Sequence, residues 1–166
     1  MKKPLDRLFG LHAKRLADLI GEQGRDAYDL IGVAVDAKWN SLIMALAEGD
    51  GATSTELAAR TGLSRQLVEH RIRKMTDAKL ITSEVDKEDA RRRLYRINPR
   101  QKKLVQDVHD AMAKFEKVYS ALWKEIGIDG GEAILRIESA LLAKPLDQRY
   151  AGMFPSDMKS KSKDVA

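Results

Sequence analysis

The sequence has no cysteine, so the chain forms no disulfide bond and offers no thiolate to a metal or a redox signal. It has only four prolines, and aromatic residues make up 5%, which is unlike a collagen-like or proline-rich chain. No apolar run approaches the length of a membrane span, and no continuous apolar segment follows the basic residues at the start. We therefore expect a globular protein of the cytoplasm.

The sequence is instead rich in charge and in short apolar stripes. Its 166 residues are 43% hydrophobic and 33% charged, which suits a mainly α-helical protein with one small core and helical extensions. The net charge of +5 is local, because Ser54 to Lys103 contain 14 Lys and Arg against 7 Asp and Glu. A basic middle segment favours binding to a polyanion such as nucleic acid, and a solvated charged face is the alternative.

Residues 1–35 are predicted to form an N-terminal helical region used for dimerisation. Apolar side chains recur at helical spacing over residues 5–31. Gly21 and Gly24 weaken the middle of this segment, so it is either one long helix or two helices in series.

Residues 36–98 contain the outline of a helix-turn-helix followed by a hairpin. Asp36 caps a short helix, Thr53 and Glu56 have the spacing of a capping box, and Ser64 caps a further helix. Two alternating segments, LITSEV and RLYRIN, flank the polar sequence DKEDARR as two strands flank a long hairpin loop. A helix-turn-helix followed directly by a basic hairpin is a winged helix.

The second helix of the helix-turn-helix has an apolar face and a polar face. Val68, Ile72 and Met75 fall on the inner face. The outer face suits the major groove of DNA, where Arg and Gln read base edges and a helix N-terminus accepts phosphate. A surface helix with solvated charge is the alternative. The predicted DNA contacts of this helix are Ser64, Arg65, Gln66, Glu69, His70, Arg73 and Lys74.

Three consecutive arginines lie at the end of the predicted loop and the start of the strand that follows it. In a winged helix such a loop reaches the flanking minor groove, which is narrow and strongly negative over A·T-rich sequence. We expect Arg91 to insert there, and Asp89 to hold its guanidinium in a bidentate pair. We expect Arg92 and Arg93 to contact phosphates. A solvated loop whose charges pair with one another is the alternative.

Three features of the sequence occur together. They are the spacing from the tryptophan-bearing helix to the recognition helix, the KLI that enters the wing, and the DAR within the wing. From Trp39 to Pro99 this pattern resembles the MarR-type winged-helix transcriptional regulators. The resemblance implies a homodimer on double-stranded DNA with a palindromic operator, and a repressor released by a small phenolic or aromatic effector. Leu67, Glu69 and Arg71 depart from the family pattern, so the base preference cannot be transferred.

Two further helices are predicted over residues 99–146, as C-terminal dimerisation helices. A stripe from Leu104 to Ile126 marks a long amphipathic helix, and a shorter helix stops before Pro145. In a chain this short, the surface that covers such a stripe is expected to be a second copy. Residues 147–166 are polar and without period, and we expect them to be disordered.

The sequence does not point to an enzyme, a cofactor or a metal. Its three histidines lie far apart, and no phosphate loop, nucleophile elbow or metal-ligand spacing occurs. By resemblance, an effector pocket would use His12, Arg15 and Trp39, although a hydrogen-bonded histidine and a core tryptophan are ordinary alternatives. Nonspecific architectural DNA binding and a structural helical module are the other functions that the residues allow.

Overall fold

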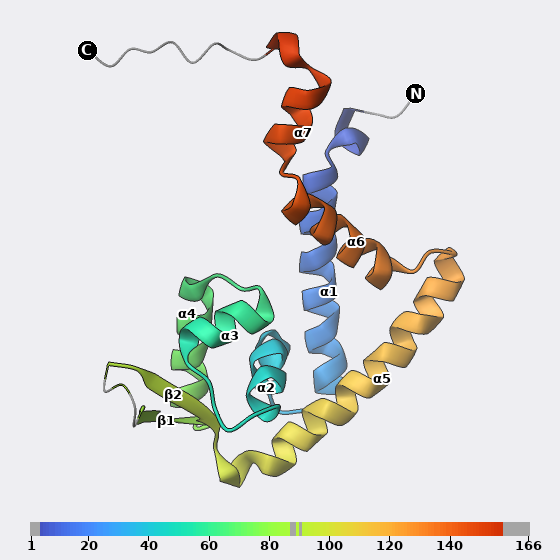
Figure 1. Ribbon diagram of the computed structural model, residues 1–166. Helices are drawn as coiled ribbons and strands as arrows, with labels where there is room; N and C mark the ends of the chain where they lie inside the picture. The colour runs from blue at the N-terminus through green and yellow to red at the C-terminus, as the bar shows by residue number, and fades with distance from the viewer. Residues whose placement is uncertain (1–3, 87–88, 90, 158–166) are drawn as a thin grey trace, which may run out of the picture. The chain divides into compact units, whose positions relative to one another are not determined.

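The computed structural model describes residues 4–86, 89 and 91–157 (Figure 1). The chain divides between Lys114 and Phe115 into two compact units. The boundary lies inside one long helix. The reason is that the first half of this helix buries Val108 and Ala111 within the first unit.

The elements of the first unit follow the predicted order. They are η1 (Pro4–Arg7), α1 (Phe9–Ile31), η2 (Ala37–Trp39), α2 (Asn40–Ala47), α3 (Ser54–Thr61), α4 (Arg65–Asp77), β1 (Ile81–Val85), β2 (Arg93–Ile97), η3 (Pro99–Gln101) and the start of α5 (Lys102–Ile126).

Helix α1 is one continuous helix, which resolves the choice left by its glycines. It runs through Gly21 and Gly24, each of which costs about 1 kcal/mol relative to alanine in a helix interior. Gly32 ends the helix in the left-handed conformation, with φ 70°, and its N–H bonds back to the carbonyl of Asp29. Of the residues of α1, Tyr28 is buried, and burial raises the pKa of its hydroxyl.

The winged helix is built from α2, α3, α4 and the hairpin (Figure 1). Helix α3 packs on α2 and α4, and β2 contacts both α2 and α3. The strands are antiparallel, with Ile81 opposite Ile97. Ala52 and Tyr95 exchange two backbone hydrogen bonds of 3.0 and 2.9 Å, so the segment before α3 is joined directly to the wing. The expected mainly α fold with a small β-hairpin wing is confirmed.

Short-range signals in the sequence set the ends of these helices. Thr53 and Glu56 form the full capping box of α3, and the Ser64 hydroxyl accepts the N–H of Leu67 at the start of α4. Gly51 has φ 116°, and a side chain there would meet the Arg96 side chain within 3 Å. Burial of apolar side chains then holds the elements together. The largest fully buried side chains of this core are Leu42, Ile43, Leu57, Val68, Met75 and Val108, with Tyr28.

The second unit consists of the end of α5, α6 (Gly130–Ala143), α7 (Leu146–Met153) and η4 (Pro155–Asp157). Gly130 is required where α6 begins, because a Cβ there would lie 2.6 Å from the ring of Trp123. Trp123 in turn stacks on Tyr119, with ring centroids 5.6 Å apart. These contacts fix the turn from α5 into α6.

The prediction of a disordered tail from residue 147 is wrong in its first part. Helix α6 ends at Ala143, and Pro145 precedes α7 as its N-cap residue, where the missing N–H costs no helical hydrogen bond. The rings of Tyr150 and Phe154 then pack with centroids 5.0 Å apart across the end of α7. Residues 158–166 of the predicted tail lie outside the described residues. In the part of the chain that is described, no helix combines the length and the apolar character of a membrane span.

Candidate nucleic-acid interface

Helix α4 has the two faces that its sequence predicts. Val68, Ile72 and Met75 are buried against the other helices. The side chains proposed to contact DNA are exposed, except Glu69, which is half-buried. Arg65 Nε and Glu69 Oε1 form an ion pair of 2.9 Å, four residues apart along the helix. Because this pair is exposed to solvent and contributes little to stability, Arg65 can leave Glu69 at little energetic cost.

Asp89 and Arg91 of the wing interact, but the carboxylate of Asp89 accepts a backbone N–H and not the Arg91 guanidinium. The N–H of Arg91 donates to Asp89 Oδ1 at 2.9 Å, and the N–H of Arg92 donates to the carbonyl of Asp89 at 2.9 Å. Asp89 therefore shapes the turn at the wing rather than orienting the Arg91 guanidinium in a bidentate pair, which corrects the prediction. Lys87, Glu88 and Ala90 of the predicted loop lie outside the described residues.

Arg92, which was predicted to contact phosphate, forms ion pairs within the protein. Its Nη2 lies 2.9 Å from Glu56 Oε1, and its Nε lies 3.7 Å from Asp86 Oδ2. The other oxygen of Glu56 accepts the N–H of Thr53 at 2.8 Å in the capping box. This backbone hydrogen bond is the main cause that lowers the pKa of Glu56, and the charge of Arg92 contributes further. The carboxylate is therefore ionised at neutral pH.

Arg93 makes a neutral contact in place of an ion pair. Its Nη1 donates to the Ser83 hydroxyl across the hairpin at 3.1 Å. Among the carboxylates that the structure describes, no ion pair with Arg91 or Arg93 occurs. Their positive charges are thus available to an external anion such as a phosphate.

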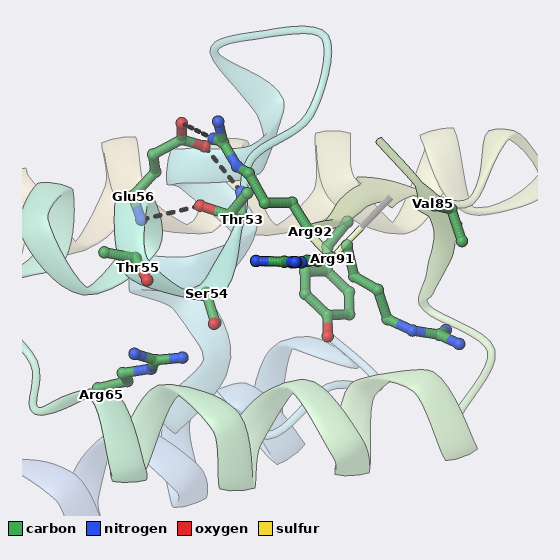
Figure 2. Close-up of a pocket in the computed structure, with 10 residues that line it drawn as sticks. Thr53, Ser54, Thr55, Glu56, Arg65, Val85, Arg91 and Arg92 are labelled. Carbon is green, nitrogen blue, oxygen red and sulfur yellow. Dashed lines mark hydrogen bonds and ion pairs between the residues drawn. The ribbon is translucent and has the colours of Figure 1, made fainter. Parts of the chain in front are cut away.

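The start of α3, the start of α4 and the wing enclose an open cleft of about 640 Å³. Figure 2 shows Glu56 on one side of the cleft, where it is hydrogen-bonded to Thr53 and paired with Arg92. Arg65, on the first turn of α4, lies on another side of the cleft. Hydroxyl groups at the N-terminus of α3 line it as well, and this helix end favours negative charge. The cleft is lined by Thr53, Ser54, Thr55, Glu56, Arg65, Val85, Arg91, Arg92, Arg93 and Tyr95.

The structure does not bring the three predicted effector residues together. His12 Nε2 lies 3.1 Å from the carbonyl of Leu5, and His12 and Arg15 line a shallow surface of α1 that does not include Trp39. Trp39 is half-buried in η2, next to the end of α1. Tyr28, near that end, is sixteen residues after His12, about 24 Å along an α-helix. His12 is thus hydrogen-bonded but exposed, unlike the core histidine of the alternative.

A groove that the sequence did not predict lies within the first unit, between α2, β2 and the start of α5. Its volume is about 410 Å³, within the range of small-molecule sites. Met44, Ile97 and Val105 give it apolar walls, and Lys102 and His109 lie at its side. The lining runs from Met44 to His109, a span of 65 positions, and no local motif connects its residues. No sequence pattern could therefore have predicted the groove. Among the described residues, no cluster of His, Asp or Glu could hold a metal.

Comparison with known proteins agrees with this geometry. The sequence model of the MarR family matches residues 37–92, from η2 to the wing. The chain contains a MarR-family winged helix-turn-helix. Solved structures share the fold of this chain over most of its length. No curated protein matches the chain.

Three solved structures illustrate the similarity in fold. The transcriptional repressor CouR, bound to a 23-mer DNA duplex, has 17% identity and a TM-score of 0.66, with 86% of this chain and 98% of that chain covered. MepR of S. aureus, in a DNA complex, has 16% identity and a TM-score of 0.64, with 81% and 96% covered. PcaV of Streptomyces coelicolor, with its natural ligand, has 17% identity and a TM-score of 0.59, with 89% and 99% covered.

Proposed function

We propose that the chain is a homodimeric transcriptional regulator that binds a palindromic DNA operator. The observation that supports this most strongly is the arrangement of α4 and the wing around one cationic cleft. Helix α4 exposes Arg65 and Gln66 at its N-terminus, the part of a recognition helix that contacts base edges. Arg91 and Arg93 project from the wing, where the backbone and minor groove of the same duplex would lie.

The homodimer is supported by apolar side chains that a monomer leaves in water. Along α1, Leu16 and Leu19 are each 49% exposed, and along α6 Leu135 is 64% exposed. Contiguous apolar faces of this kind mark protein interfaces, and a second copy supplies a matching face by symmetry. Two recognition helices of such a dimer would enter successive major grooves, with half-site centres about 10 base pairs apart.

Selection of binding sites from a random duplex library at near-physiological salt tests this function. A palindrome with half-sites one helical turn apart is the expected result. The alternative function is nonspecific architectural DNA binding, which would give no motif and a retention that falls steeply with salt. If the protein retains no duplex at all, the proposal that it binds DNA is contradicted.

The regulator is proposed to be a repressor that a small aromatic effector releases from DNA. The groove beside Lys102 supports this part, because a cation next to apolar walls suits an aromatic carboxylate. Tryptophan fluorescence of the Trp123→Phe variant reports on Trp39 alone, and phenolic acids are the ligands to titrate. A saturable change that is lost in Lys102→Ala supports the groove, and no response at millimolar ligand contradicts it.

A further inference from the structure

We propose that Arg92 is a positioning residue that fixes the wing to helix α3, rather than a residue that contacts DNA. The wing latch is defined as Glu56, Arg92 and Asp86. This inference rests on the proposed DNA-binding function and assigns to one arginine of the wing a role different from that of its two neighbours.

The guanidinium of Arg92 bridges two elements of the fold. Arg92 uses Nη2 for Glu56 at 2.9 Å and has Nε 3.7 Å from Asp86, so it bridges a helix of the helix-turn-helix and the base of the wing. Asp86 and Arg92 are also joined through the backbone, because the N–H of Asp86 donates to the carbonyl of Arg92 at 2.9 Å. The latch therefore lies where the strands open into the wing loop.

The charge of the latch disfavours a phosphate at Arg92. Two carboxylates face one guanidinium in the latch, so its formal charge is −1 when all three groups are ionised. A phosphate would have to displace Glu56 from Arg92 and would then meet an uncompensated carboxylate. Arg91 and Arg93 have no such competitor among the described carboxylates. Arg91 and Arg93 are thus the arginines of the wing that bind phosphate.

The carboxylate of Glu56 is already held in one direction by the capping box. Its Oε2 accepts the N–H of Thr53 at 2.8 Å, while the N–H of Glu56 donates to the Thr53 hydroxyl at 3.2 Å (Figure 2). A carboxylate held by a capping box at a rigid helix end is a defined anchor for the wing arginine. The direction in which the wing presents Arg91 and Arg93 to DNA then depends on this anchor.

Glutamine at position 56 separates the latch from the cap. The capping box accepts either Glu or Gln, so Glu56→Gln keeps the cap of α3. A side-chain amide has a single oxygen, however, and once this oxygen accepts the N–H of Thr53 only the amide NH₂ faces Arg92. The substitution therefore breaks the latch and at the same time removes one negative charge from the DNA-binding surface.

These two effects predict opposite changes in DNA affinity. If Arg92 acts through the latch, Glu56→Gln and Arg92→Ala each weaken binding about two- to fivefold, the range expected for an exposed ion pair. The double variant is then no weaker than the weaker single variant. If charge alone matters, Glu56→Gln binds more tightly than the wild type, as does the control Asp77→Asn at the end of α4.

The experiment measures affinity for the selected duplex over a series of salt concentrations. A phosphate contact contributes about 0.9 to the slope of log K against log salt, so Arg93→Ala should lower that slope by about 1. Arg92→Ala should keep the wild-type slope, with unchanged thermal unfolding as the check on folding. The proposal is overturned if Arg92→Ala lowers the slope as Arg93→Ala does, or if Glu56→Gln binds as tightly as the wild type or more tightly.

Failure of the proposed function gives a different result. A wild-type protein that selects no motif contradicts sequence-specific regulation, whereas the latch is judged from differences among variants on a duplex that the wild type binds.

Discussion

Among the described residues, every buried apolar side chain lies between Tyr28 and Ala111, and the helices that follow bury none. Leu57 and Met75 have no exposed surface in the winged helix, whereas Leu142 of α6 is 85% exposed. The two regions have similar apolar periodicity in sequence. They differ in how much apolar surface each buries within its own unit.

This difference separates two tasks. The winged helix completes its own core and can present α4 and the wing in a fixed geometry to DNA. The apolar faces of α1 and α6 are exposed to water, which is unfavourable in free energy. Association with a second copy would bury these faces and remove that cost. If the proposed function holds, the winged helix recognises one half-site, and the exposed helices pair two copies of the chain.

The largest expected effect comes from the winged-helix core. Met75→Ala removes a fully buried side chain and should lower the free energy of unfolding by about 2–5 kcal/mol, because a cavity remains. Met153→Ala is the matched control, since Met153 is 74% exposed, and should change it by at most about 0.5 kcal/mol. Urea denaturation measures both. Equal losses would mean that the two regions do not differ as proposed.

The next effect comes from the exposed face of α6. Ile134→Glu combined with Leu141→Glu places two charges one heptad apart on this face and should convert the dimer to a monomer in sedimentation experiments. Affinity for the palindrome should then fall about 100-fold, because the contacts to the two half-sites are no longer linked in one molecule. Ser139→Glu, at a polar position of α6, should leave both unchanged. A dimer that survives the double substitution excludes this face from the interface.

A smaller effect is expected at the recognition helix. Arg65→Ala should relax preference at one base position, a loss of about 1–3 kcal/mol in discrimination, because a bidentate contact to a base edge disappears. Arg91→Ala should weaken binding most at sites with A·T-rich flanks. Parallel binding curves on single-base variants of the operator distinguish the two. Uniform losses on all sequences from both variants would show that neither residue reads DNA as proposed.

The smallest expected effect concerns the cap of α3. Thr53→Ala removes the hydroxyl that accepts the N–H of Glu56 and should cost about 1 kcal/mol of stability. Thr53→Ser keeps that hydroxyl and should cost much less. Thermal unfolding of the two variants gives the comparison, and identical melting temperatures would contradict a role for the capping box.

Local signals account for what the sequence predicted correctly. The capping box at Thr53, the Ser64 cap and the alternating strands each depend on neighbouring residues, and each occurs as predicted. The latch joins Glu56 to Arg92, 36 residues apart, and no local rule links them. The first part of the tail was predicted wrongly because the short α7 depends on Pro145 and on one aromatic contact rather than on a long apolar stripe.

The central claim is that winged helices read half-sites and apolar helices pair them. The most direct test is the mass of the complex that the protein forms with the selected palindrome and with a single half-site, together with both affinities. The account predicts two chains on the palindrome and much weaker binding to the half-site. One chain bound to each duplex with equal affinity would contradict it.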